Sequence, residues 1–491
     1  MKKFANAFLW LTASEIFFNI AAYVVHAVIG RVLGPADYGR YGLVVTLTTM
    51  VIVLIGNGIP TAMAKYVSEK IEANPDDIRS IKRQAAKLQM LVIGSITILF
   101  FFLSPVIAWL LRDPSLTPLF QLSSLVIPAF AAASFYHHYF TGLHLFKLQA
   151  IVKIVRSIAR VGFIICAALL FGVEGSIGGY VLAPLFTFLA AIAIDEFYVK
   201  RKLGIGRKLD GHTFHFPMKT IAAYAGPLTL FLIFYELLLT LDLYFVKALL
   251  HDDHLTGLYN AAITVGRIPY YLFYALAMIL LPAISKSTFE AKEEETEALI
   301  QKSLRFLLLL LTPMVTLLTI FATPALQFFF GNKYLEAAPA MQIFTIGVGF
   351  LTVFYVLAFA FNGAGKVKIP MNIALVGLIA FIPLNLFFIP KWGIVGASTA
   401  MAIVSCILMI GILFSVRKHF GASLPLFSML RVFISVIILI PIASILPHGH
   451  FSFLFSGATL FILYLISIHV LGELTTEDID PIRKLFRKTE K

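Results

Sequence analysis

Four ionisable side chains stand inside long apolar stretches of this chain, namely Glu15, Glu236, Asp242 and Arg267. A charge at the centre of a bilayer costs about 2.5–3.5 kcal/mol on insertion scales, so such residues persist where they face a cavity or a partner. The planar donors of a guanidinium match phosphate oxygens, whereas a carboxylate can bind and release a cation or a proton. We therefore expect an anion site at Arg267 and sites for Na⁺ or H⁺ at the carboxylates.

Two of these residues, Arg267 and Asp242, also have a purely structural interpretation. Arg267 could form an ion pair with Glu236 on a neighbouring antiparallel helix. Asp242 lies nearer the outer end of its helix, and a solvated charge in an outer vestibule is the preferred interpretation there. Glu236 follows Glu15 by 221 residues, a spacing close to that of the internal repeat described below. The two glutamates could therefore face each other across a cavity.

A second group of charges recurs at helical spacing. Lys153, Arg156 and Arg160 stand at i, i+3 and i+7, so a helix places them on one face. They could attract an anionic lipid head group, or anchor the helix at the positive inner surface with their stems buried. The sequence His-Asp-Asp-His at 251–254 is the one candidate metal cluster, and a solvated turn explains it better, so no metal site is predicted.

The composition indicates the elements that must position these residues. Hydrophobic residues make up 59% of the 491 residues and charged residues only 13%. In soluble proteins about 45–50% of the residues are apolar and about 25% are charged, so this composition excludes an ordinary soluble enzyme. The net charge of +13 suits cytoplasmic loops better than nucleic-acid binding. Two cysteines, both in apolar runs, exclude a disulfide framework.

About 20 apolar residues are needed to cross a bilayer as a helix. Runs of this kind predict an all-α polytopic membrane protein with about fourteen transmembrane helices. The first run continues too far for a signal peptide and is interpreted as a retained helix. The predicted spans are 5–30, 41–63, 89–111, 117–141, 150–171, 175–198, 221–247, 257–282, 304–323, 336–361, 371–389, 394–415, 430–447 and 451–471.

Positive charge alternates along these spans. With both termini in the cytoplasm, 32 of the 39 lysine and arginine residues fall in inner segments and six in outer ones, and Arg267 lies within a helix. An incorrect helix count would invert this alternation partway along the chain. The bias therefore predicts a multi-pass protein of the cytoplasmic membrane.

Short patterns repeat across the chain. Gly39-Arg40-Tyr41 returns 218 residues later as Gly257-Leu258-Tyr259, and Gly175 is matched with Gly393 at the same offset. Phe140-Thr141-Gly142 matches Phe361-Asn362-Gly363 at 221. These matches predict two like-oriented lobes of six helices, related by a parallel pseudo-twofold repeat. The expected parts are a lobe at 1–200, a cytoplasmic linker at 201–220, a lobe at 221–416, two further helices at 430–471 and a cytoplasmic tail at 472–491.

Two stretches carry a resemblance to a known family. GRVLGPADYGRYGLV, beginning at Gly30, and GLYNAAITVGRIPYYLFYALAMILLPAISK, beginning at Gly257, resemble segments of polysaccharide and lipid-linked oligosaccharide flippases. These belong to the multidrug/oligosaccharidyl-lipid/polysaccharide flippase (MOP) superfamily. The resemblance implies two six-helix lobes around a cavity, alternating access, and an isoprenoid phospholipid substrate that carries sugars.

The resemblance also implies roles for particular residues. An arginine in helix eight is important in related lipid II flippases, and Arg267 occupies the matching position. The first helix lacks the arginine cluster of those proteins. Arg267 would contact the phosphate or pyrophosphate of the substrate.

Further side chains are candidates for the same transport cycle. Lys153, Arg156 and Arg160 would attract the head group, and Tyr270 and Tyr271 would stack on sugar rings or simply line the path. Glu15 and Glu236, with Asp242 as a third candidate, would couple transport to Na⁺ or H⁺.

Two other functions remain open on the sequence. The carboxylates would suit a cation-coupled multidrug exporter of the same superfamily, although Arg267 and the basic helix face argue against cationic cargo. A membrane polysaccharide polymerase would require a large outer loop or a metal-binding cluster. We expect a transporter and no enzyme, with no organic cofactor, and with glycosyltransferases or a polymerase of the same pathway as partners.

Overall fold

The computed structural model describes residues 2–55, 58–71, 77–199, 218–290, 292–424, 426–449 and 451–474. Within these ranges the regular structure is helical and contains no strand. Nine described segments are long and apolar enough to cross a membrane. Helix α8 (Met218–Leu250) and the helix pair α9 (Asp253–Gly266) and α10 (Ile268–Phe289) cover the two remaining predicted spans of the central region. The predicted all-α fold with fourteen spans is confirmed. Most of the predicted linker lies outside the described residues.

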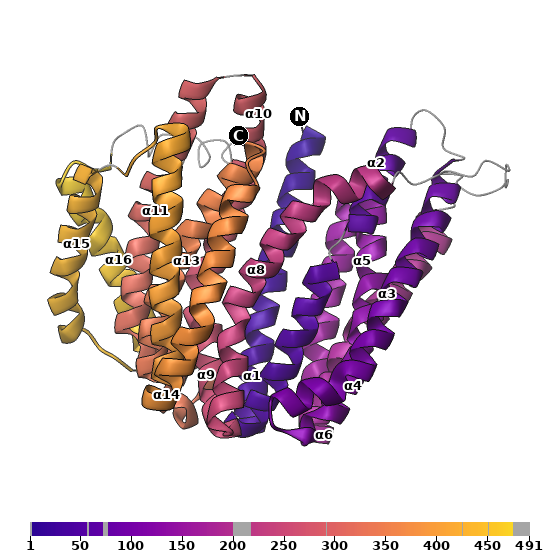
Figure 1. Cartoon of the computed structure of the whole chain (residues 1–491), viewed down its shortest axis with the longest axis horizontal. Helices are drawn as coiled ribbons and strands as arrows, with labels where there is room; N and C mark the ends of the chain where they lie inside the picture. Colours follow the sequence, from indigo (N-terminus) through magenta and orange to yellow (C-terminus); the bar gives the residue numbers. More distant parts are fainter. Residues whose placement is uncertain are drawn as a thin grey trace. The chain divides into compact units, whose positions relative to one another are not determined.

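Close packing divides the chain into two units, Met1–Asn260 and Ala261–Lys491. The predicted lobe boundaries remain predictions. The elements of the first unit (Figure 1) are α1 (Lys2–Ile55), α2 (Gly58–Lys70), α3 (Asp77–Leu110), η1 (Pro114–Leu116), α4 (Thr117–Ser124), α5 (Val126–Gly142), α6 (Phe146–Ile194), η2 (Asp195–Val199), α8 (Met218–Leu250) and the start of α9 (Asp253–Gly266).

The second unit holds the remaining helices. After the end of α9 they are α10 (Ile268–Phe289), α11 (Glu293–Ile320), α12 (Ala322–Phe330), η3 (Asn332–Ala337), α13 (Ala338–Gly363), α14 (Lys368–Phe420), α15 (Leu426–Ile445) and α16 (Ser452–Val470).

The three longest helices each join two predicted spans at a glycine. The breaks occur at Gly34 (φ 75°), Gly172 (φ 60°) and Gly393 (φ 57°). These angles are easily reached only by glycine, because a Cβ atom would clash with the backbone. A glycine, joined in α6 by the neighbouring Phe171, therefore kinks each helix between the two spans that the apolar pattern separates.

The backbone corrects the register of the repeat. Gly172 has φ 60° and ψ −136°, and Gly393, which lies 221 residues later, has φ 57° and ψ −135°. The predicted pairing of Gly175 with Gly393 was therefore wrong by three residues, because glycines recur at every third position there and match at either offset. Gly175 instead corresponds to Gly396, because both glycines pack on the carbonyl oxygen eight residues earlier. A Cβ atom on Gly175 would lie 2.0 Å from the Ala167 oxygen, and one on Gly396 would lie 2.2 Å from the Phe388 oxygen.

The other repeated motif brings α1 and α9 into contact within the first unit. A Cβ atom on Gly257 would lie 1.7 Å from the carbonyl oxygen of Pro35, and one on Gly39 would lie 2.7 Å from the nitrogen of Gly257. Next to this crossing, the Asn260 side chain fills the space above Gly42. The equivalent glycines of the two motifs thus pack directly on each other, which requires that both lack a side chain.

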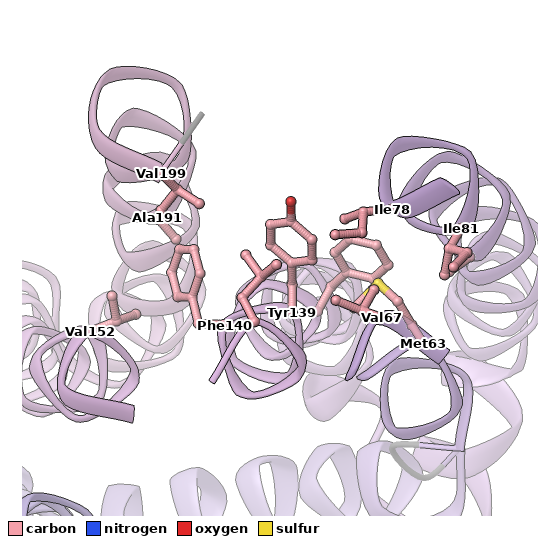
Figure 2. Packing of buried hydrophobic residues seen from close by; sticks show 12 residues of the cluster. Met63, Val67, Ile78, Ile81, Tyr139, Phe140, Val152, Ala191 and Val199 are labelled. Carbon is pink, nitrogen blue, oxygen red and sulfur yellow. The ribbon is translucent and has the colours of Figure 1, made fainter. Parts of the chain in front are cut away.

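A buried apolar cluster ties α2, α3, α5 and α6 together at one end of the first unit (Figure 2). Figure 2 shows Phe140 pointing toward Ala191 and Val199, and Tyr139 lying on the side of Met63 and Ile78. Each of these six side chains is buried. Burying a large apolar side chain contributes about 1.5–3 kcal/mol. This cluster fixes the base of α6, which carries the basic residues described below.

Adjacent glycines in α6 allow a matched test of this packing. We expect Gly179→Ala to lower the free energy of unfolding by about 1–3 kcal/mol, because it overpacks a tight helix contact. Its Cβ atom would lie 2.5 Å from the Phe163 oxygen and 2.6 Å from Ile164 Cα, whereas one on Gly178 has no neighbour within 4 Å. Gly178→Ala should be neutral or stabilising. Detergent unfolding curves that rank the two variants in the opposite order would contradict this packing.

Candidate functional site

Three cationic side chains of α6 converge on one aromatic ring of α1. Lys153 Nζ lies 5.2 Å from the centroid of Phe18, and the guanidinium carbons of Arg156 and Arg160 each lie 5.6 Å from it. The predicted shared face is therefore present. We call these three cations the basic stripe. The sequence did not single out Phe18, because phenylalanine is so abundant in the apolar runs.

The two arginines of the basic stripe lie deep within a membrane helix. At 1.5 Å per residue, Arg156 and Arg160 are about 15 and 21 Å from the start of α6. Arg156 also packs 4.0 Å from the centroid of Phe130, and Arg160 lies 5.8 Å from that of Tyr180. Aromatic rings of α1, α5 and α6 therefore hold both guanidinium groups within the unit.

One buried donor of the basic stripe has no acceptor, and its two arginines have no anionic partner, in the described part of the chain. Arg160 Nε is buried and has no hydrogen-bond partner, and neither Arg156 nor Arg160 forms an ion pair with any residue that the structure describes. A buried donor without an acceptor costs about 1–3 kcal/mol. The basic stripe thus has the chemistry of a site for an anionic group.

One acidic residue reaches the basic stripe. Glu15 of α1 forms an ion pair with Lys153, and its side chain is 58% exposed. The sequence selected both residues but did not pair them. Glu15 therefore acts as the counter-ion at the start of the basic stripe, and its role in ion coupling stays a prediction.

The two carboxylates of α8 differ in environment. Asp242 is fully buried, and it accepts hydrogen bonds from Tyr259 Oη at 2.6 Å and from the Leu243 nitrogen at 2.9 Å. The preferred interpretation of Asp242 as a solvated vestibule charge was wrong, because the turn after α8 brings α9 back over it. Glu236 is half-buried. Ion coupling at either residue remains a prediction.

Arg267 stands where α9 joins α10 in the second unit. Its guanidinium carbon lies 5.7 Å from the centroid of Phe344 on α13. The Nε and Nη2 atoms are buried and have no hydrogen-bond partner among the described residues. The alternative interpretation, an ion pair with Glu236, stays a hypothesis from the sequence. Tyr270 and Tyr271 follow on α10, the former buried and the latter exposed.

The His-Asp-Asp-His turn has local structural roles. Asp252 accepts a hydrogen bond from the Leu255 nitrogen at 3.1 Å and so caps α9, and Asp253 forms an ion pair with the buried Lys247. Among the described residues, no three histidine, cysteine or acidic side chains are grouped as metal ligands.

Sequence reasoning missed a buried ion pair between α3 and η2. Lys82 pairs with Asp195, which is almost fully buried, and its Nζ lies 4.4 and 4.2 Å from the ring centroids of Tyr136 and Tyr139. Asp195 could have been found, because it falls inside a predicted span. Lys82 was counted only as loop charge.

The fold is that of a polytopic membrane protein, and comparison with known proteins agrees with it. A family model described as "Polysaccharide biosynthesis protein" matches residues 4–288, more than half of the chain, and a MatE model matches 227–387. The chain belongs to the polysaccharide biosynthesis protein family, within the MOP superfamily.

Individual relatives span nearly the same length. The uncharacterized membrane protein MJ1068 of Methanocaldococcus jannaschii is 23% identical over 79% of each chain. Stage V sporulation protein B of Bacillus subtilis is 25% identical over 84% of this chain and 82% of its own. The solved lipid II flippase MurJ in its inward closed conformation has a TM-score of 0.74 at 17% identity, covering 94% of this chain and 98% of its own.

Proposed function

We propose that this chain is a flippase that moves a lipid with a phosphate or pyrophosphate head and attached sugars across the cytoplasmic membrane by alternating access. The observation that carries the proposal is the basic stripe, whose deep arginines have no anionic partner among the described residues. Arginine suits this role because its planar donors match phosphate oxygens. The similarity to a lipid II flippase and the family description support the same class of cargo.

The basic stripe and Arg267 would act on the same head group. Lys153 exchanges Glu15 for the substrate anion, and Arg156 and Arg160 supply the deeper contacts. Arg267, with two buried donors to satisfy, provides an anion contact in the second unit. The lipid tail stays in the bilayer, where its burial needs no protein site.

The remaining parts of the cycle complete the proposal. Glu15, Glu236 and Asp242 are candidates for binding Na⁺ or H⁺ that drives net movement, and both termini lie in the cytoplasm. Glycosyltransferases that assemble the sugar, or a polymerase that uses it, are the partners that such a substrate requires.

The test is binding of polyprenyl diphosphate to the purified protein. We expect the double variant Arg156→Gln/Arg160→Gln to weaken binding by about 100-fold, since each charged hydrogen bond contributes roughly 1.5 kcal/mol. The matched control is Lys65→Gln/Lys87→Gln, which removes the same charge from two exposed positions of the same unit. Affinity can be measured in nanodiscs by native mass spectrometry.

Two results would oppose the proposal. Equal losses in both double variants would show that only overall charge matters. The competing function, a multidrug exporter, is favoured by the MatE match and by the buried Asp242. Tight binding of a lipophilic cation such as tetraphenylphosphonium, lost in Asp242→Asn, together with no binding of polyprenyl diphosphate, would establish that alternative.

A further inference from the structure

An aromatic cluster lies in the second unit where α10 packs on α13. Tyr274 stacks on Tyr355 with ring centroids 5.9 Å apart and an angle of 21° between planes. Tyr270 meets the same Tyr355 ring edge-on at 5.2 Å, and Tyr271 is edge-on to Tyr270 at 5.2 Å. Phe359 backs Tyr355 at 4.7 Å. The contacts hold four tyrosines in one arrangement.

The cluster has a buried part and an exposed part. Tyr270 and Tyr355 are only 7% and 3% exposed, whereas Tyr271 and Tyr274 are 48% and 43% exposed. The two buried rings therefore form a packed base. This base fixes the orientation of the two exposed rings, which present a surface. The sequence grouped Tyr270 with Tyr271 and did not select Tyr274.

The position of these rings along the helix argues against an interfacial belt. Helices α9 and α10 are continuous through Arg267, whose nitrogen donates to Ile263 O at 3.1 Å while Tyr271 N donates to Arg267 O at 3.4 Å. Tyr271 and Tyr274 lie about 27 and 32 Å along a helix of about 55 Å, at 1.5 Å per residue. Belt tyrosines lie at the two membrane surfaces, near the ends of a spanning helix. These two lie near its middle.

The same helix face carries Arg267. Arg267, Tyr271 and Tyr274 stand at i, i+4 and i+7, the spacing of one helical face. The partners of these residues on α13 follow one another in the same order along the chain, because Arg267 lies against Phe344 and Tyr274 lies against Tyr355. The exposed rings therefore follow the guanidinium by one to two turns, about 6–10 Å along the axis.

This arrangement matches a head group in which sugar follows phosphate. A tyrosine offers an apolar ring face for the C–H side of a pyranose and a hydroxyl for its polar edge. We propose that Tyr271 and Tyr274, held by Tyr270 and Tyr355, form a stacking surface for the sugar of the substrate beside an anion contact at Arg267. The inference rests on the proposed function and adds the residues that recognise the saccharide.

The experiment compares one lipid with and without its sugar. The probes are polyprenyl diphosphate and the same lipid carrying N-acetylglucosamine, glucose or galactose. We expect the wild-type protein to bind at least one sugar-bearing probe about tenfold more tightly than the bare diphosphate, the size of an aromatic stacking contribution. In Tyr271→Leu/Tyr274→Leu this preference should fall to less than twofold, with the affinity for the bare diphosphate unchanged.

Two further variants make the test specific. Tyr274→Phe keeps the ring and should retain most of the preference. Tyr198→Leu removes another half-exposed tyrosine, from the first unit, and should change nothing. An undiminished sugar preference in the double leucine variant, or equal losses for both kinds of probe, would overturn the stacking surface. Either of these results would leave the proposed function in place. Failure of every probe to bind the wild-type protein would overturn both the stacking surface and the proposed function.

Discussion

Replacing Lys247 by methionine is expected to lower the free energy of unfolding by about 3–5 kcal/mol, the usual cost of removing one partner from a buried ion pair. Lys247 is buried near the end of α8, where it donates to Asp113 Oδ2 at 2.7 Å and pairs with Asp253 of α9. Methionine fills a similar volume but leaves two carboxylates without their cation. The loss should appear in detergent unfolding curves at neutral pH.

The pH dependence gives this prediction a second readout. Burial alone would raise the pKa of Asp113, but hydrogen bonds from Lys247 and Ser115 and the charge of Lys247 outweigh it, so the pKa of Asp113 is lowered. An aspartate whose pKa is lowered by folding stabilises the fold at pH values above its unfolded pKa of about 3.9. This stabilisation is lost as the pH falls through the pKa of the folded state. The difference between wild type and Lys247→Met should therefore shrink below about pH 4.

A surface pair supplies the control. Lys65 lies 3.9 Å from Glu69, and both side chains are largely exposed. Lys65→Met should change stability by less than about 1 kcal/mol, because solvent screens such pairs. If Lys247→Met were as stable as the wild type at neutral pH, the ion pairs of Lys247 would not hold the turn before η1 to α8 and α9.

Glu473→Gln should selectively loosen α15 and α16, the last two helices of the second unit. Glu473 is 2% exposed, and its carboxylate accepts hydrogen bonds from Arg305 Nε of α11 at 2.9 Å and from Arg431 Nη1 of α15 at 3.0 Å. Burial alone would raise its pKa, but hydrogen bonds from Ser428, Arg305 and Arg431 lower the pKa of Glu473 overall. The neutral amide removes the charge that balances two arginines, at a cost of about 3–5 kcal/mol.

Hydrogen exchange can locate this effect. Amides of α15 and α16 should exchange faster in Glu473→Gln, whereas those of α13, which does not depend on this carboxylate, should keep their protection. Tyr464 also donates to Leu309 O at 2.8 Å, so α16 should loosen without leaving the protein. The exposed Glu336→Gln is the matched control. Unchanged exchange in α16 would contradict a structural role for Glu473.

Several features of the fold follow from local sequence alone. The apolar runs located all fourteen spans, because the length of a membrane helix is set by the bilayer and not by its neighbours. The spacing of Lys153, Arg156 and Arg160 predicted their common face, because helix geometry fixes which side chains lie together. The repeat was detected, although its register at Gly393 was three residues off, since recurring glycines make two alignments equally good.

The partners of the charged residues depended on tertiary packing. Glu15 and Lys153 are 138 positions apart, and Asp242 meets Tyr259 only because α9 turns back over α8. Lys247 and Glu473 each sit at a helix end that looks like ordinary loop charge in the sequence, yet packing buries both between helices. The sequence by itself determined how many helices cross the membrane and that the three cations of the basic stripe share one helix face. Only the three-dimensional contacts decided which charges are neutralised and which, like Arg160 and Arg267, keep buried donors without a hydrogen-bond partner among the described residues.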